Sequence, residues 1–546
     1  MSCVTTQEVW LVRRSRCGVV AGLVAVGLVA SACTVGDDSD EGTVESSAPV
    51  SARPHDVSPN AVAGVVIPEG QIDRAVGDLD RLAGELMEDS GIPGMAVAVV
   101  HKGKVRYSKG FGVRDVTTGD PVGEATVFQL ASLSKPLGAT VVARQVGAGR
   151  VDWDTPVWEL SPGFALEDPY VSEHVTVGDL YAHRSGLPDH AGDLLEDLGY
   201  DQEQVLERLR QLPLAPFRDS YAYTNFGLTA AAVAVADKVD TDWATLSERE
   251  IYQPLGMNDT SSRYADFVAR PDRAVGHVLV DGRYQPADPS RDPDAQSPAG
   301  GASSSVRDMA RWLTMLLGDG TYEGVEIVPS AALLPAISPQ AVSAPPADPD
   351  SRAGFYGFGF NVNSSSAGRV VLGHSGAFNL GAGTAFTAIP SADVAIVTLT
   401  NAAGIGIPET LNAEFADLVQ FGEIREDWRE LYRTAFEQID APTGELVGKE
   451  PPASPVPARP LDAYAGSYDN TFYGAATVAV RDDELVLVLG PDETTLPLRH
   501  WDGDTFVFTP TGEGADPGTV SKATFDGDRL MLEYYNREGE GTFVRS

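Results

Sequence analysis

The segment FQLASLSKPLGAT, residues 128–140, places two serines and a lysine at the start of a predicted helix. In its S-x-x-K pattern, Ser132 and Lys135 are three residues apart, a spacing that puts both side chains on one face of a helix. A serine hydroxyl becomes a good nucleophile only when a neighbour takes its proton, and a lysine does so where burial or another cation lowers its pKa. The alternative is that Ser132 or Ser134 only caps the helix, and this pattern alone leaves both interpretations open.

A second segment, YAYTNFGL at 221–228, contains Tyr223 and Asn225 as Y-x-N. An extended tripeptide points its first and third side chains in the same direction. A phenol near an ammonium group can relay a proton, and the amide beside it can bind a substrate carbonyl. A half-buried structural tyrosine is the alternative. The copy at Tyr468–Asn470 has no partner motif nearby, and we interpret it as structural.

A third segment, VVLGHSGAF at 370–378, leads an apolar strand into His374 and Gly376. A glycine here permits close approach of a substrate backbone, and the N–H of Ala377 can face an oxyanion. One alternative is a strand end with a polar cap. Another is a G-x-S-x-G nucleophile elbow with Ser375 as the nucleophile. The alanine at the fifth position and the non-helical continuation FNLGAG argue against the elbow.

The order of elements predicts an α+β domain. Strands are predicted at 94–100, 105–113, 368–374, 383–389 and 394–400, and helices at 137–146, 205–212, 228–238 and 305–317. Because strands come first and last with helices between, we expect the two ends to join in one antiparallel sheet.

Taken in order, S-x-x-K, Y-x-N and H-x-G resemble the serine β-lactamase and penicillin-binding-protein superfamily. The class C-like branch, with its D-alanyl-D-alanine carboxypeptidases and esterases, is the most similar part. Flanking segments such as VTVGDLYAHRSGLP at 175–188 fit the same branch, and the resemblance spans roughly 71–421. It implies a β-lactamase-like antiparallel sheet flanked by an all-helical region. It also implies a serine hydrolase that forms an acyl-enzyme from a D-amino-acid peptide, an ester or a β-lactam-like substrate.

The resemblance also implies a role for each motif residue. Ser132 would be the acylated nucleophile, Lys135 its activating partner and Tyr223 the proton relay. The residues expected to bind substrate are Asn225, His374, Gly376 and Ala377, with the N–H groups of Ser132 and Ala377 as the oxyanion hole. His183, in the HRSG segment, matches a recurrent family position that we interpret as structural.

This sequence departs from many relatives at one motif, because they have K-T-G where it has His374-Ser375-Gly376. A lysine there anchors a substrate carboxylate, whereas a histidine is only partly charged at neutral pH. Carboxypeptidases and esterases of the family also use H-x-G, so the resemblance still implies an active enzyme, but we do not expect strong β-lactamase activity. No segment resembles the deacylation glutamate of class A enzymes.

The chain divides into a hydrolase domain at 71–442, a Pro-rich linker at 443–460 and a small all-β domain at 461–546. In the last part, short alternating strands are separated by turns such as RDD and FDGD, a pattern typical of a small barrel or sandwich. This C-terminal β module resembles domains appended to such hydrolases.

The N-terminus predicts export. Arginines at 13, 14 and 16 precede an apolar run at 18–30, too short for a membrane span but typical of a signal peptide, here 1–32. The run ends in VASAC, which resembles a lipobox with Cys33 as the acylated residue. A plain secretory signal is the alternative. We expect an acidic tether at 33–70 and a protein on the extracytoplasmic face of a bacterial membrane, lipid-anchored or secreted.

Composition limits the partners. The formal net charge of −38 repels phosphate backbones and makes nucleic-acid binding improbable. All three cysteines lie at or before position 33, so the exported part has no disulfide. We expect no cofactor or metal, because H-E-x-x-H is absent and the eight histidines are scattered. The expected partner is a small-molecule or peptide substrate. A non-catalytic cell-surface binding or sensing lipoprotein with a vestigial hydrolase domain is the alternative function.

Overall fold

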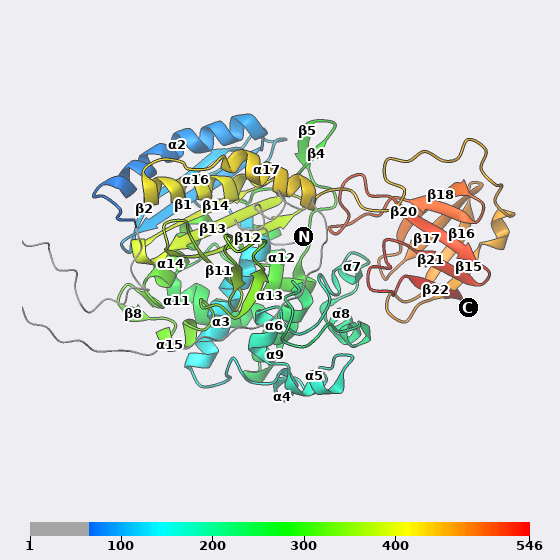
Figure 1. Ribbon diagram of the computed structural model, residues 1–546, viewed down its shortest axis with the longest axis horizontal. Helices are drawn as coiled ribbons and strands as arrows, with labels where there is room; N and C mark the ends of the chain where they lie inside the picture. Colours follow the sequence, from blue (N-terminus) through cyan, green and yellow to red (C-terminus); the bar gives the residue numbers. More distant parts are fainter. Residues whose placement is uncertain (1–64) are drawn as a thin grey trace, which may run out of the picture.

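The computed structural model describes residues 65–546. The predicted signal peptide, Cys33 and the tether up to residue 64 lie outside the described residues. Figure 1 shows a sheet-and-helix domain, coloured from blue to yellow, with a smaller orange and red barrel beside it. In the described part of the chain, no helix is both long and apolar enough to cross a membrane.

One eight-stranded antiparallel sheet forms the centre of the larger domain. Its strands in spatial order are β2 (Lys104–Gly112), β1 (Gly94–His101), β14 (Val394–Thr400), β13 (Ala382–Ile389), β12 (Val370–Phe378), β11 (Asn361–Ser364), β10 (Gly354–Tyr356) and β9 (Ala341–Ala344). The register pairs Met95 with Thr400, which confirms that the two ends of the domain join in one sheet. Strands β1 and β14 are covered on both faces, so all of their residues except His101 are buried and most of them are apolar.

Helices cover both faces of the sheet (Figure 1). On one face lie α2 (Gln71–Ser90), α16 (Ile407–Phe421) and α17 (Trp428–Ile439). Alternate residues of β1 separate the two layers: Val97 and Val99 pack with α2 and α16, while Ala96 and Ala98 pack on the opposite side with α14 (Val306–Leu317). This alternation is the period-two pattern expected of a strand between two helical layers.

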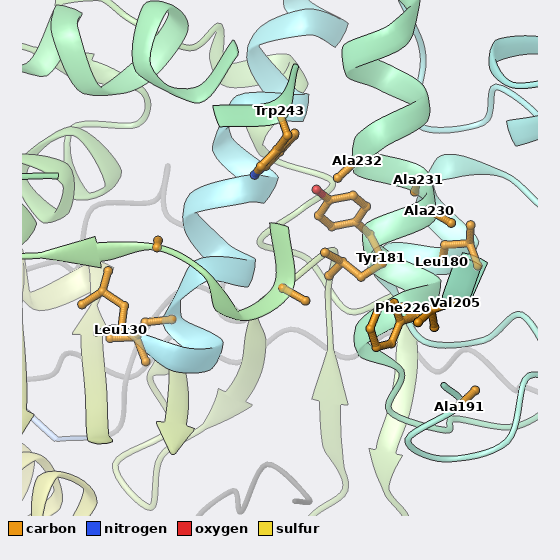
Figure 2. Packing of buried hydrophobic residues seen from close by; sticks show 14 of the residues in the cluster. Leu130, Leu180, Tyr181, Ala191, Val205, Phe226, Ala230, Ala231, Ala232 and Trp243 are labelled. Atoms are coloured by element: carbon orange, nitrogen blue, oxygen red, sulfur yellow. The ribbon is translucent and has the colours of Figure 1, made fainter. Parts of the chain in front are cut away.

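The remaining helices form the predicted helical region beside the sheet. They are α3 (Ser134–Gly147), α4 (Val157–Leu160), α5 (Pro169–His174), α6 (Val177–Tyr181), α7 (Asp193–Glu196), α8 (Gln202–Arg208), α9 (Asn225–Lys238), α10 (Trp243–Ser247), α11 (Gln253–Leu255), α12 (Tyr264–Ala269), α13 (Ser297–Gly300) and α15 (Ser330–Leu333). Figure 2 shows Tyr181 and Trp243 beside the alanines of α9. Gly138 of α3 lets both rings approach, because a Cβ there would lie 3.1 Å from Trp243 and 3.4 Å from the Tyr181 hydroxyl.

The predicted helices exist, with shifted ends. The helix expected at 205–212 is α8 followed by a 3₁₀ turn at Leu209–Gln211. The helix expected from 305 begins at Val306, because the Ser305 side chain caps it by accepting a hydrogen bond from the N–H of Asp308.

The C-terminal module is a closed antiparallel barrel, which decides between the barrel and sandwich predictions. Its strands are β15 (Gly466–Asp469), β16 (Ala476–Arg481), β17 (Glu484–Leu489), β18 (Thr494–Asp502), β19 (Thr505–Phe508), β20 (Ser521–Asp526), β21 (Arg529–Leu532) and β22 (Thr542–Arg545). The RDD turn joins β16 and β17 through Asp482 and Asp483, both at positive φ, as a tight hairpin requires.

The segment predicted as a linker lies against the barrel. The N–H of Thr443 donates to the Thr519 hydroxyl at 3.1 Å, and the N–H of Val456 donates to Asp502 at 2.6 Å. The Y-x-N copy at 468–470 is structural, because Asn470 Oδ1 accepts from the N–H groups of Phe472 and Tyr473 and closes a turn.

Six short strands form three separate pairs: β3 (Phe128–Gln129) pairs with β6 (Ser303–Ser304), β7 (Thr321–Tyr322) pairs with β8 (Val325–Glu326), and β4 (His277–Val280) pairs with β5 (Arg283–Pro286). The hairpin of β4 and β5 projects beside the sheet. The β3–β6 pair matters for the site, since β3 ends directly before the turn that carries Ser132.

Candidate active site

Ser132 lies in a 3₁₀ turn, Ala131–Leu133, that leads directly into α3. Ala131 has a φ of 47°, which is uncommon for a residue with a side chain. Its side chain is fully buried and packs with Phe378 and Ala382 of the sheet, and this packing holds the unusual conformation. Ser132 is less buried than Ala131 or Leu133, so the turn presents this one hydroxyl toward solvent.

The helix-capping interpretation of the two serines is wrong. Neither the 3₁₀ turn nor α3 has a side-chain cap. Ser134 instead donates to the carbonyl of Ala131 at 2.7 Å and accepts from the N–H of Ala302 at 2.9 Å. Ser134 therefore braces the turn, and Ser132 is left for other contacts.

Lys135 is completely buried and its ammonium group lies among acceptors. Its Nζ is 3.0 Å from the Ser132 hydroxyl, 2.7 Å from Oδ1 of Asn225 and 3.0 Å from the carbonyl of Ala299. It also lies 4.5 Å from the centre of the Tyr223 ring, within the range of a cation–π contact. The predicted Ser–Lys pair is thus in direct hydrogen-bonding contact.

Tyr223 completes the group around the nucleophile. Its hydroxyl donates to Oγ of Ser132 at 2.9 Å, and its ring is buried. The ring packs 4.5 Å from that of His183, whose Nδ1 accepts the N–H of Thr224 at 3.1 Å. His183 therefore holds the segment that carries Tyr223, consistent with the structural role predicted for it.

Asn225 contacts the protein with both ends of its amide. Oδ1 accepts from Lys135, and Nδ2 donates to Asp193 at 2.9 Å. Asp193 in turn lies 2.8 Å from Nδ1 of His190. Burial opposes ionisation of Asp193, but its hydrogen bonds with His190 and Asn225 lower its pKa below the ordinary value. The amide thus links Lys135 to the carboxyl of Asp193, and its expected contact with a substrate carbonyl stays a prediction.

Sequence reasoning missed His190 and Asp193. They lie in the segment PDHAGDLLE, where no spacing relates them to Asn225, 32 residues further along the chain from Asp193. An H-x-x-D pair near a helix start is too common to predict this contact.

His374 lies in the middle of β12 and is buried. Its Nε2 is 2.7 Å from the hydroxyl of Tyr356, and its ring lies 6.4 Å from that of Tyr223. Burial, together with the positive charge of Lys135, lowers the pKa of His374 to about 3. The expectation of a partly charged histidine is therefore wrong: the imidazole is neutral at neutral pH.

Gly376 lets β12 approach the turn that carries Ser132. A Cβ at this position would lie 2.6 Å from the Thr384 hydroxyl, 2.7 Å from the carbonyl of Leu130 and 2.8 Å from the N–H nitrogen of Ser132. The prediction assigned the close approach to a substrate backbone. The structure shows that the protein's own backbone already requires a glycine here.

Ala377 follows on the part of β12 that β11 does not reach. The β11 register ends at Gly373, whereas β13 pairs with β12 as far as Phe378. One edge of this part of β12 therefore lies beside the Ser132 turn, as the Gly376 distances show. An oxyanion hole built from the N–H groups of Ser132 and Ala377 is compatible with this arrangement and stays a prediction.

The alternatives proposed for Ser375 are wrong. Ser375 lies inside a nine-residue strand, neither at a strand end nor at a strand-to-helix turn. Its hydroxyl donates to the carboxyl of Glu409 on α16, on the face of the sheet opposite to His374. Burial raises the pKa of Glu409 to about 7. A nucleophile elbow would need Ser375 exposed at a sharp turn.

Two family models match the chain. Residues 79–420 match the model described as Beta-lactamase, and residues 450–529 match a domain of unknown function, DUF3471.

Curated relatives include "Unguisins hydrolase ungD" from Aspergillus violaceofuscus, 28% identical over 82% of this chain and 85% of that protein. "D-alanyl-D-alanine-carboxypeptidase/endopeptidase AmpH" from Escherichia coli (strain K12) is 25% identical over 45% of this chain and 63% of that protein. Among solved structures, the octameric penicillin-binding protein homologue from Pyrococcus abyssi has a TM-score of 0.56 and 21% identity, covering 86% of this chain and all of that one. That likeness supports the fold.

Proposed function

This chain belongs to the beta-lactamase family, and from that premise we propose that it is a serine hydrolase that forms an acyl-enzyme on Ser132. One observation carries the proposal. The Ser132 hydroxyl lies 3.0 Å from Nζ of Lys135 and 2.9 Å from the hydroxyl of Tyr223, so it directly contacts the two groups that can take its proton once one of them has lost its own.

In the proposed acylation step, Oγ of Ser132 attacks the carbonyl carbon of an ester or amide. Its proton passes to the Lys135–Tyr223 pair, which takes part with one proton removed (neutral amine with phenol, or ammonium with phenolate), as the C–O bond to serine forms. The N–H groups of Ser132 and Ala377 stabilise the oxyanion of the tetrahedral intermediate. Collapse of the intermediate breaks the bond to the leaving alcohol or amine, which takes a proton from Tyr223.

Deacylation repeats these transfers with water. Water attacks the ester of Ser132, gives a proton to the same pair, and the carboxylic acid leaves as Oγ recovers its proton. Asn225 and Ala299 keep Nζ of Lys135 directed at Ser132 throughout, because each accepts a hydrogen bond from it. The net reaction adds one water across the ester or amide bond.

We propose D-amino-acid peptides and small esters as the substrate class. The neutral, buried His374 supports the small esters in this class, because it lacks the fixed positive charge that K-T-G relatives offer to a substrate carboxylate. For the same reason we expect weak turnover of β-lactams. The names of the relatives, a hydrolase of unguisins and a carboxypeptidase/endopeptidase, agree with peptide-like substrates.

The test is covalent labelling of purified protein with a fluorescent alkyl phosphonate. Wild type should incorporate one probe per chain, and Ser132→Ala none. Ser366→Ala is the control, since it alters an exposed serine between β11 and β12 and should still be labelled. Equal labelling of wild type and Ser132→Ala would overturn the proposal.

In the described part of the chain, no observation favours the vestigial binding protein over the enzyme.

We also propose that the protein is exported and anchored through Cys33. The proposal rests on the arginines before the apolar run and on the VASAC sequence. Cells fed an alkyne-labelled fatty acid should label wild type and the Cys17→Ser control but not Cys33→Ser. Labelling of Cys33→Ser at the wild-type level would contradict it.

A further inference from the structure

The C-terminal barrel reaches into the hydrolase domain through one loop. We define the barrel loop as residues 511–518, between β19 and β20. Glu513 of this loop accepts the N–H of Asn379 at 2.6 Å and the N–H of Leu380 at 3.2 Å, one on each carboxyl oxygen. Nδ2 of Asn379 donates back to the carbonyl of Glu513 at 3.0 Å. Nδ2 of Asn379 also donates to Oδ1 of Asp516 at 3.3 Å, so four hydrogen bonds attach the barrel loop to the turn between β12 and β13.

A second set of contacts holds the barrel loop to the end of α7. The carboxyl of Asp197 accepts the N–H of Glu513 at 2.9 Å and the N–H of Gly514 at 2.7 Å. A Cβ at Gly512 would lie 2.7 Å from Cγ of Asp197, and one at Gly514 would lie 2.9 Å from Oδ2. The glycines of the TGEG sequence let the loop backbone close around this carboxylate.

A buried arginine contacts α7 and the sheet and acts electrostatically on Glu513 of the barrel loop. Nη2 of Arg291 lies 2.5 Å from Oε2 of Glu196, and both side chains are less than a tenth exposed. The guanidinium also lies 5.2 Å from the centre of the Phe378 ring, in a cation–π contact. Burial lowers the pKa of Arg291, but the carboxyls of Glu196 and Asp197, and that of Glu513 where it is ionised, hold this pKa above its ordinary value.

These contacts act on the strand that lies beside the nucleophile. Phe378 packs against Ala131, the residue before Ser132. Ala377 precedes Phe378, and Asn379, held by Glu513, follows it. The hydrolase motifs contain no residue of the barrel. The barrel loop is nevertheless hydrogen-bonded to the turn that follows β12.

We propose that the barrel is a working part of the hydrolase site. Its loop, through Glu513, fixes the end of β12 and so positions Ala377 and Phe378 beside Ser132. The proposal rests on the acyl-enzyme function argued above and assigns a role to the domain that matches DUF3471. Glu513 is a positioning residue, because it contacts the β12–β13 turn and not the reacting atoms.

The charge of this interface predicts how it responds to pH. Burial raises the pKa of Glu513 to about 8 and that of Glu196 to about 7. Between pH 4.5 and 8 the carboxyl of Glu513 is protonated when the barrel loop is docked but ionised when the loop is free. Docking therefore binds a proton, and the docked state becomes less stable as pH rises from about 4.5 to 8. Above pH 8 the stability of docking levels off. The groups around it that bear on this balance are Arg291, Glu196, Asp197, Asp193, Asp516 and Tyr534.

The experiment uses the full chain and compares wild type with Glu513→Ala, Glu513→Gln and the control Glu484→Ala, which alters an exposed carboxylate on β17. Hydrogen–deuterium exchange is measured first, since it requires no turnover. The peptide that covers 372–386 should exchange at least about fivefold faster in Glu513→Ala than in wild type or the control. Unchanged exchange in that peptide overturns the proposal.

The same variants are then assayed with a p-nitrophenyl ester from pH 6 to 9. Glu513→Ala should lower kcat about 10- to 100-fold with a smaller change in KM, because a misplaced oxyanion donor affects the transition state most. Glu513→Gln keeps an acceptor and should recover most of kcat, with a flatter alkaline limb than wild type. A wild-type kcat in Glu513→Ala overturns the positioning role. Absence of any turnover or phosphonate labelling in wild type would instead contradict the proposed function, and the exchange data would still decide the role of the barrel loop.

Discussion

Oδ1 of Asn225 lies 2.7 Å from Nζ of Lys135, closer than the Ser132 hydroxyl at 3.0 Å. The amide therefore fixes the position of the lysine from which the serine is activated. Its other end is anchored at 2.9 Å to Asp193, so the lysine is held through a chain of contacts to a charged group.

We predict that Asn225→Ala lowers the rate of acylation about 10- to 100-fold, because Nζ of Lys135 loses its closest acceptor and its alignment with Ser132. Stopped-flow labelling with the phosphonate measures this rate separately from deacylation. Asn258→Ala, at an exposed site near α11, is the control and should react at the wild-type rate. Wild-type acylation by Asn225→Ala would show that the amide does not position Lys135.

The close approach of β12 to the Ser132 turn gives a second prediction. Gly376→Ala should lower kcat at least about 100-fold and destabilise the fold by about 1–3 kcal/mol, since the added methyl would lie within 2.8 Å of three neighbours. Gly373→Ala on the same strand is the matched control, because its methyl would meet only the carbonyl of Phe386, at 3.0 Å. Ester hydrolysis and thermal unfolding measure the two effects. If both variants lose the same activity, the approach at Gly376 is not specific to catalysis.

Much of this site follows from local sequence. The three-residue spacing of Ser132 and Lys135 predicted their contact, and the alternating and helical periods predicted β1, β14, α3 and α9. Both kinds of signal depend on neighbours within one or two turns of the chain. The order of strands and helices then predicted that the ends of the domain would meet.

What the sequence did not predict depends on contacts between distant segments. The neutral state of His374 results from burial beneath Tyr356 and from the charge of Lys135, 239 positions earlier in the chain. The hydrogen bond from the N–H of Asn379 to Glu513 joins residues that are 134 positions apart in the chain. Neither contact produces a local sequence pattern. A single glutamate in a glycine-rich turn, for example, is typical of an ordinary loop.

The contact between Ser375 and Glu409 leads to a third prediction. Ser375→Ala should keep full phosphonate labelling, because Ser375 points away from Ser132 and toward α16. It should destabilise the fold by about 1–3 kcal/mol, since it leaves a buried carboxyl without that donor. Intact mass spectrometry counts the bound probe, and chemical unfolding measures stability. Loss of labelling in a folded Ser375→Ala protein would revive Ser375 as a nucleophile.

A fourth prediction concerns the charge of His374. Because burial and Lys135 lower its pKa to about 3, its ring should stay neutral from pH 8 down to pH 5, and its NMR signals should not titrate in that range. The native state then binds fewer protons than the unfolded state, whose histidine titrates near the ordinary value of 6.5. The stability that His374 contributes is present above pH 6.5 and is lost as pH falls toward 3, by about 1.4 kcal/mol per pH unit.

His374→Gln tests this sign directly. Glutamine keeps a polar contact with Tyr356 but cannot titrate, so the unfolding free energy of the variant should fall less steeply between pH 6.5 and 4.5 than that of wild type. Buried carboxyls such as Glu409, whose pKa is raised to about 7, oppose this slope equally in both proteins and cancel in the comparison. Parallel slopes would mean that His374 is protonated in the folded protein near pH 6, which would restore a cationic site opposite Ser132 and with it the case for substrates that carry a carboxylate.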